Sequence, residues 1–165
     1  MDGTGNDEAG RLRILHSYGA LDTPNEAVFD DIVREAARDF NVPVALISLV
    51  DEHRQWFKAK VGLTPSETPR SISFCTHAIR GPEVMVVEDA AADERFARNP
   101  LVTGDPNIRF YAGAPLKTPD GKRIGTLCVL DTHARAAPTE ADKAKLEALA
   151  ARTVEAFERR ARRAG

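Results

Sequence analysis

The sequence of 165 residues has only two cysteines, Cys75 and Cys128. Two thiols do not make the disulfide framework of a small secreted domain, so we expect both to be reduced. No apolar run approaches the roughly 20 residues that a membrane span requires. Residues 1–10 lack the charged start and apolar core of a secretory signal. These absences predict a cytoplasmic chain that does not bind membranes.

The chain also lacks an excess of charge of either sign. Its 23 basic and 25 acidic residues give a formal net charge of −2, which offers no general attraction to nucleic acid. The basic run at residues 159–163 is expected to form the last turns of a helix, where positive charge complements the dipole. We therefore expect no nucleic-acid partner and, from the length, one domain with a single core.

Helical patterns occur near both ends of the chain. Residues 1–10 are expected to be a disordered tail, residues 11–18 a short helix, and Pro24 with Asn25 to open a longer helix that ends at Asn41. Its apolar residues recur at helical spacing: Val28, Phe29, Ile32, Val33, Ala36, Ala37 and Phe40.

A second long helix is predicted to begin at Thr139, with Asp142 completing a capping box. Its apolar stripe is Leu146, Leu149, Ala150, Val154 and Phe157. Further alanines, such as Ala148 and Ala151, predict packing against a second copy of the chain. We therefore expect a homodimer through the terminal helices, and a basic helix end at residues 161–165.

The strands follow two kinds of pattern. Residues 44–50 are nearly all apolar, which is typical of a central strand covered on both faces. Residues 55–61 alternate, which predicts Phe57, Ala59 and Val61 on one face and Trp56, Lys58 and Lys60 on the other. Trp56 is expected to be a packing residue.

The middle of the chain is irregular. We expect loops at residues 63–70 and 99–107, a strand end or a short helix at 71–80, a strand at 83–88 and one or two helical turns at 90–98.

Residues 109–131 contain two strand patterns joined by a turn at Pro119, Asp120 and Gly121. Alternation places Arg109 and Tyr111 on one face and Phe110, Ala112 and Ala114 on the core face. Strands between helical ends predict an α+β fold.

Several motifs occur in a fixed order: Leu-Asp-Thr-Pro at 21–24, Ile-Ser-Leu-Val-Asp at 47–51, Gln-Trp-Phe at 55–57, Phe-Cys-Thr-His-Ala-Ile at 74–79, Asp-x-Arg-Phe at 93–96 and Asn-Pro-Leu-Val at 99–102. With the hairpin of residues 109–131, they resemble the GAF domain over about residues 11–160. The motifs look like the bacterial signalling subgroup found ahead of histidine kinases and diguanylate cyclases. The resemblance implies a central antiparallel sheet of five or six strands. It places the N- and C-terminal helices on one face, and a ligand pocket with short helices and loops on the other.

The resemblance implies a small-molecule-sensing regulatory domain of a signal-transduction system, without catalysis of its own. Ligand occupancy would pass through the terminal helices to a histidine kinase, a diguanylate cyclase or another signalling partner. The candidate pocket residues are Phe74, Cys75, His77, Arg109 and Tyr111. A guanidinium and a phenol in the pocket would bind a small polar or anionic ligand. Arg109 could instead pair with an acid such as Asp89 or Asp131.

The sequence predicts neither a cofactor nor a metal. On a strand, Cys75 and His77 would share a face and could ligate one metal or hold one cofactor, but two ligands do not complete a metal site. Some GAF domains attach a tetrapyrrole to a cysteine followed directly by histidine, but Thr76 intervenes here. The Asn-Lys pair of cyclic-nucleotide-binding GAF domains is absent from the sequence.

Two other functions stay open. The first is a thiol-dependent enzyme of the free methionine-R-sulfoxide reductase kind, which would use Cys75 and Cys128 as nucleophile and resolving thiol. A buried core thiol is the other interpretation of Cys128. The second is a dimerisation module without a ligand. Whether the chain stands alone or is an excised domain is not decided by the sequence.

Overall fold

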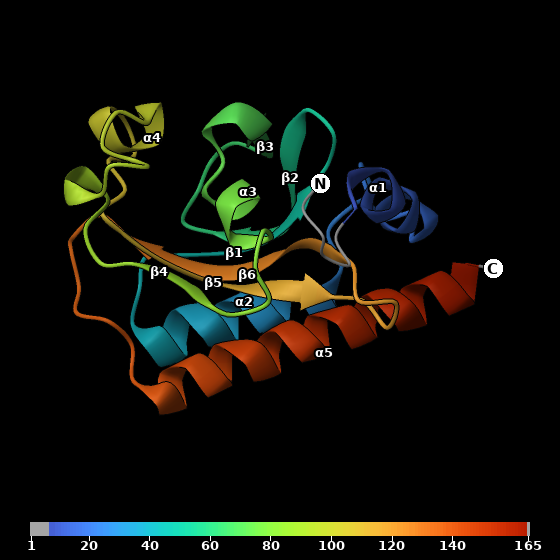
Figure 1. Ribbon diagram of the computed structural model, residues 1–165. Helices are drawn as coiled ribbons and strands as arrows, with labels where there is room; N and C mark the ends of the chain where they lie inside the picture. The colour runs from blue at the N-terminus through green and yellow to red at the C-terminus, as the bar shows by residue number, and fades with distance from the viewer. Residues whose placement is uncertain (1–6, 165) are drawn as a thin grey trace.

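The strands of the chain form one six-stranded antiparallel sheet (Figure 1), which confirms the predicted α+β class. The computed structural model describes residues 7–164. The strand order is β3-β2-β1-β6-β5-β4. The strands are β1 Val44–Val50, β2 Arg54–Val61, β3 Glu67–Pro69, β4 Met85–Val87, β5 Phe110–Lys117 and β6 Arg123–Asp131.

Two long helices, α2 (Ala27–Phe40) and α5 (Glu140–Ala164), cover one face of the sheet (Figure 1). Helix α2 ends where Asn41 adopts the left-handed conformation, as expected from its sequence. At the start of α5, the Thr139 hydroxyl accepts from the Asp142 amide at 3.1 Å, and the Asp142 carboxylate accepts from the Thr139 amide at 3.2 Å. The predicted capping box is therefore present.

Helix α1 (Glu8–Ser17) lies beside the sheet and starts earlier than the sequence suggested. The Asp7 carboxylate accepts a hydrogen bond from the Gly10 amide at 2.8 Å, which caps the helix ahead of Glu8. The expected boundary between a tail and the domain at residue 10 therefore falls inside a helix. Residues 1–6 of the expected tail lie outside the described residues.

Short helices cover the other face of the sheet. They are the 3-10 turns η1 Arg70–Ile72 and η2 Ala90–Ala92, and the helices α3 Phe74–Ala78 and α4 Pro100–Thr103. For residues 71–80 the sequence allowed either a strand end or a short helix, and the structure shows that they form helical turns. A separate apolar cluster lies on each face of the sheet, and the cluster under α3 belongs to the candidate site.

A β-bulge in β2 changes which residues face the site. Ile47 pairs with Ala59 and Ser48 pairs with Phe57, so Lys58 is the extra residue. Trp56 and Ala59 join the core under the terminal helices, whereas Phe57 joins the opposite core. The prediction that Phe57 shares a face with Ala59 is wrong, because strict alternation fails at a bulge.

The hairpin of β5 and β6 agrees with its sequence pattern. Phe110, Ala112 and Ala114 face the terminal helices, and Tyr111 faces the short helices. Strand β1 lies between β2 and β6 and is buried along its whole length.

Within the described residues, no helix is both long and apolar enough to cross a bilayer.

Candidate functional site

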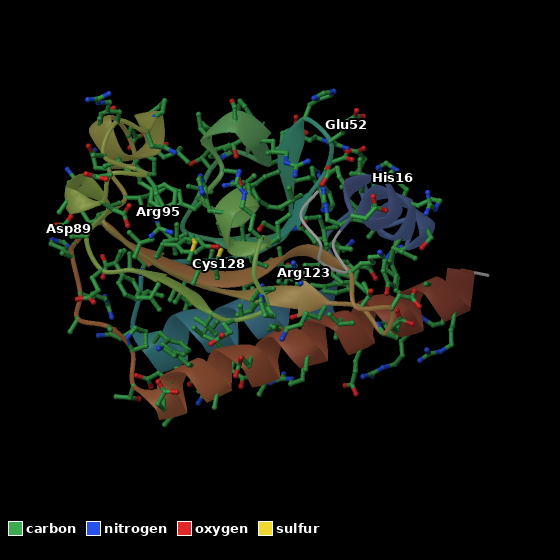
Figure 2. All side chains as sticks on the ribbon, in the orientation of Figure 1. His16, Glu52, Asp89, Arg95, Arg123 and Cys128 are labelled. Carbon is green, nitrogen blue, oxygen red and sulfur yellow. The ribbon has the colours of Figure 1, made fainter. Side chains whose placement is uncertain are left out.

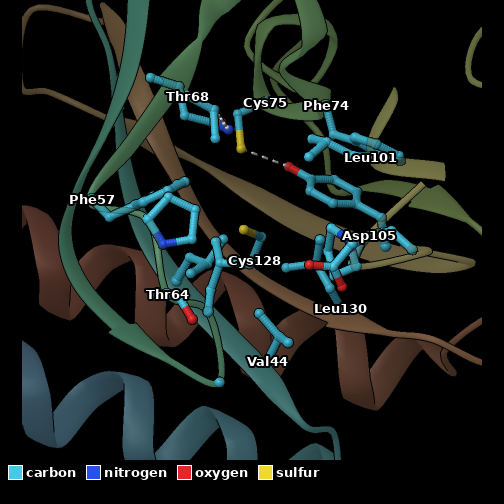
Figure 3. A pocket seen from close by; sticks show the side chains of 18 residues that line it. Val44, Phe57, Thr64, Thr68, Phe74, Cys75, Leu101, Asp105, Cys128 and Leu130 are labelled. Atoms are coloured by element: carbon cyan, nitrogen blue, oxygen red, sulfur yellow. Dashed lines mark hydrogen bonds between the residues drawn. The ribbon is translucent and has the colours of Figure 1, made fainter. Parts of the chain in front are cut away.

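A cavity of about 230 Å³ lies on the face of the sheet opposite α2 and α5 (Figure 3). Strands β1, β2, β5 and β6 supply its floor, and α3 supplies one wall. Residues 62–65 and 105–106 belong to loops that border it. Its apolar lining consists of Val44, Leu46, Phe57, Leu63, Pro65, Phe74, Leu101, Pro106, Ile108 and Leu130.

A few polar groups interrupt this apolar lining. The Gln55 side-chain amide donates to Thr68 Oγ1 at 2.9 Å, and its carbonyl accepts from the Ser73 hydroxyl at 2.7 Å. Both ends of the Gln55 side chain are thus held in place. Asp105 is exposed and is the only Asp, Glu, Lys, Arg or His among the described residues that line the cavity.

Cys75 lies on the cavity wall with its sulfur against the sheet. The Ser73 side chain caps α3 by accepting from the Thr76 amide at 3.1 Å, and the first turn of the helix then directs Cys75 inward. Ser48 Oγ donates to Cys75 Sγ at 3.0 Å, and the Tyr111 hydroxyl donates at 3.3 Å (Figure 3). Thr126 Oγ1 lies 3.0 Å from the same sulfur. We call Ser48, Tyr111 and Thr126 the hydroxyl cluster.

The second cysteine belongs to the same group of polar atoms. Figure 2 shows Cys128 on the side of the sheet that faces α3, and both thiols line the cavity. Burial disfavours the Cys75 thiolate, but hydrogen bonds from Cys128 and the hydroxyl cluster outweigh it and lower the pKa of Cys75 to about 6. Burial and the neighbouring Cys75 raise the pKa of Cys128. The two thiols thus differ in how readily they ionise.

Aromatic rings hold the wall around Cys75. The Phe74 ring stacks on Phe96 with centroids 4.2 Å apart, and lies 5.3 Å from the Tyr111 ring. All three rings are buried. Such contacts fix the position of α3 relative to β5.

Phe74, Cys75 and Tyr111 are the sequence-predicted site residues that line the cavity, whereas His77 lies outside it. On a helix, two residues separated by one position point in different directions. His77 accordingly lies in a shallow polar groove with Arg80, and its ring meets the edge of Phe96 at 4.9 Å. Burial and the nearby Arg80 and Arg95 lower the pKa of His77.

Arg109 also lies outside the cavity. Its guanidinium donates to the carbonyl oxygens of Val102 at 2.8 Å and Ile108 at 3.1 Å. The acids considered as partners are engaged elsewhere, since Asp131 binds Arg135 and Asp89 accepts from the Ala91 amide. Arg109 therefore ties α4 to the start of β5, a role that neither sequence interpretation anticipated.

Sequence reasoning missed Ser48, Thr126 and Gln55. Ser48 and Thr126 pair directly across β1 and β6, with their hydroxyls 3.0 Å apart. A hydroxyl in the middle of each otherwise apolar strand was the available signal. Within residues 7–164, no group of three or more His, Cys, Asp or Glu side chains could hold a metal ion.

Comparisons with known proteins agree with this geometry. The GAF domain family matches residues 24–157. A cyclic di-GMP phosphodiesterase of Pseudomonas aeruginosa is 47% identical over 141 residues, which make up 86% of this chain and 24% of that protein. The chain therefore spans about a quarter of the length of this relative.

Solved structures share the fold. The GAF domain of an Acinetobacter phosphoenolpyruvate-protein phosphotransferase matches with a TM-score of 0.67 and 23% identity, over 92% of this chain and 93% of that one. A free methionine-R-sulfoxide reductase of Neisseria meningitidis matches with a TM-score of 0.67 and 22% identity, over 97% and 95% of the two chains. At these identities the likeness establishes a common fold alone.

Proposed function

The chain belongs to the GAF domain family, and from this premise we propose that it is a small-molecule-sensing regulatory domain of a signal-transduction system. A relative that acts on cyclic di-GMP supports a place in signalling. The observation that carries the proposal is the cavity opposite the terminal helices. A mainly apolar cavity with a few fixed polar groups is the usual form of a small-molecule site.

The lining of the cavity defines the ligand chemistry. Its volume of about 230 Å³ lies below the ~300–1,000 Å³ typical of drug-sized ligands. The expected anionic ligand depended on Arg109 and His77, which lie outside the cavity. We therefore propose a small, mainly apolar ligand with a polar group that binds Gln55, Thr64 or Thr68, and with neutral or positive charge near Asp105.

The proposed output runs through the long helices on the opposite face. Phe57 lines the cavity, and the next residue, Lys58, pairs with Glu26 at 2.6 Å. Glu26 also pairs with Arg160 of α5 at 2.7 Å. A ligand that shifts β2 would thus act on α5 through two ion pairs. We propose that the partner is a histidine kinase or an enzyme that makes or degrades cyclic di-GMP, acting in the cytoplasm.

Thermal melting against a metabolite library tests the sensing function. A ligand that binds only the folded state stabilises it by RT ln(1 + L/Kd), where L is the ligand concentration, so the melting temperature rises with the ligand concentration. Leu101→Trp adds bulk at the cavity, and we expect it to abolish the ligand-induced shift. The matched control is Val28→Trp on α2, where the side chain is 42% exposed. Equal shifts in both variants would contradict the cavity as the binding site.

A second candidate function is reduction of free methionine-R-sulfoxide. The specific observation in its favour is that both thiols of the chain line the cavity. Incubation with free methionine-R-sulfoxide and a thiol reductant, followed by amino-acid analysis, tests it. Repeated turnover that disappears in Cys75→Ser would establish catalysis. Without turnover, the regulatory function stands alone.

A further inference from the structure

We propose that Cys75 is a site of oxidation by small hydroperoxides, with Cys128 as the thiol that resolves the oxidised product into a disulfide. The proposal shares the cavity wall with the proposed function but does not require a ligand. It rests on three features of the described residues: the donors around the Cys75 sulfur, its place on the cavity, and a second thiol on the lining of the same cavity.

The donors around Cys75 suit an anion better than a neutral thiol. A thiol sulfur is a weak hydrogen-bond acceptor, yet Ser48 and Tyr111 both donate to this one, and Thr126 lies equally close. Hydrogen bonds to a charged sulfur are stronger than those to a neutral one. The hydroxyl cluster therefore stabilises the thiolate, which is the form that attacks an oxidant.

The second feature is access. Cys75 is only 2% exposed at the outer surface, but its side chain belongs to the cavity lining. A hydroperoxide such as hydrogen peroxide is much smaller than the cavity volume of about 230 Å³. Apolar walls around the sulfur exclude larger polar oxidants and favour small uncharged ones.

The third feature is the neighbouring thiol. Cys128 lies on β6, which packs against α3, and both cysteines line the same cavity. The hydroxyl cluster surrounds the Cys75 sulfur, and burial raises the pKa of Cys128, so the two thiols have separate roles. Cys75 is the nucleophile, and Cys128 follows as the second thiol.

The chemistry balances with a hydroperoxide as the named oxidant. The Cys75 thiolate attacks one peroxide oxygen, the O–O bond breaks, and hydroxide leaves with that electron pair, which gives a sulfenic acid. The Cys128 sulfur then attacks the Cys75 sulfur, the S–O bond breaks, and water leaves with the Cys128 proton. The hydroxide takes up the proton that the Cys75 thiol released when it ionised, so that overall two thiols and one hydrogen peroxide give one disulfide and two waters. The new bond would connect α3 to β6 across the cavity wall.

Intact mass measurement with dimedone trapping tests this on the purified chain and hydrogen peroxide alone. We expect the intact mass of the wild type to fall by two hydrogens as both thiols are lost, and dithiothreitol to restore the original mass. In Cys128→Ser, the sulfenic acid should persist and add dimedone at Cys75. In Cys75→Ser, Cys128 should keep its thiol under the same exposure. Ser48→Ala leaves both cysteines in the chain. We expect this variant to be oxidised roughly tenfold more slowly, because the Cys75 thiolate loses one hydrogen bond to its charged sulfur.

Two results would overturn the proposal. One is a wild type that keeps both thiols under an exposure that fully oxidises free cysteine. The other is equal loss of the Cys128 thiol in Cys75→Ser and in the wild type. Melting curves verify that each variant folds, and Cys75→Ala replaces Cys75→Ser if the serine variant does not. Because no metabolite is present, a failed ligand screen leaves this result unchanged, and the absence of methionine sulfoxide separates it from the reductase candidate.

Discussion

Lys58 is a charged residue that lies inside the fold. Its side chain is fully buried beside the Phe29 ring, and its ammonium donates to Thr23, Pro24 and Glu26. A buried charge depends on its partners, because removing one leaves the other uncompensated. The residue that creates the bulge in β2 therefore also needs the start of α2 to be correctly placed.

Replacing the partner of Lys58 gives the first prediction. We expect Glu26→Gln to lower the free energy of unfolding by about 3 kcal/mol, because Lys58 and Arg160 both lose their carboxylate. The control is Glu35→Gln, which removes another ion pair between α2 and α5. Glu35 and Arg152 are partly exposed, so the loss there should stay within about 1 kcal/mol. Urea unfolding measures both, and similar losses would contradict the argument.

Glu8 gives a prediction for pH. Hydrogen bonds from Arg11 and then Arg70 lower its pKa from the usual 4.5 to about 2. A carboxylate with a depressed pKa stabilises the fold above its unfolded pKa, and this contribution is lost as the pH falls through the folded pKa. Because the carboxylate is 48% exposed, solvent screening limits the contribution to about 1 kcal/mol.

The measurement compares the unfolding free energy of wild type and Glu8→Gln from neutral pH down to about pH 2. We expect the wild type to be more stable at neutral pH and the difference to shrink between pH 4.5 and about 2. The exposed Glu94 provides the control variant Glu94→Gln. A difference that stays constant across this range would refute the assigned ion pairs.

At the scale of elements, the pairing of β1 with β6 depends on one glycine. Gly125 pairs with Leu49, and a Cβ added to it would lie 1.9 Å from the carbonyl oxygen of Ser48. That contact is with backbone in the centre of the sheet, so it cannot be relieved by a side-chain rotation. The same two strands carry Ser48 and Thr126, so the distance between the strands also determines the positions of these two members of the hydroxyl cluster.

We therefore expect Gly125→Ala to destabilise the fold by about 3 kcal/mol, at the upper end of overpacking substitutions. Gly81→Ala is the matched control, because a Cβ there meets nothing within 4 Å. Thermal or urea unfolding of both variants tests this. If Gly125→Ala is as stable as Gly81→Ala, the close approach of β1 and β6 is not as described.

At the scale of the whole molecule, the two long helices have an outer face that points away from the sheet and takes no part in the core. The stripe that was expected to serve a dimer, including Leu146 and Leu149, is buried within the chain's own helix-side core. Ala148 and Ala151 remain exposed on α5. The homodimer thus stays a prediction that depends on these alanines and on close approach of two copies of α5.

Sedimentation at micromolar concentration tests the dimer. We expect a dimer for the wild type and a monomer for Ala148→Glu with Ala151→Glu, because charge at the contact would be desolvated. The control is Ala91→Glu, an exposed position on η2 at the opposite face of the sheet. A monomeric wild type would refute the prediction directly.

The α+β class, the two long helices with the caps at Asn41 and Thr139, the central strand β1 and the hairpin of β5 and β6 were all predictable from the sequence. Periodic burial and capping act over a few residues, so they can be recognised without the fold. The motifs also placed Phe74, Cys75 and Tyr111 in the region of the cavity. The same reasoning failed for His77 because its segment is helical, and for Phe57 because a bulge interrupts the alternation.

Only the tertiary structure decided what the cavity contains. Arg109 donates to the Val102 carbonyl of α4 and to the Ile108 carbonyl, and the Cys75 sulfur lies against hydroxyls from β1, β5 and β6. The contacts of Cys75 join residues far apart in the chain, and no local pattern specifies which polar groups will meet at such distances. The directions of side chains on α3 and β5 are fixed by packing against other elements, so the chemistry of the site follows from the fold.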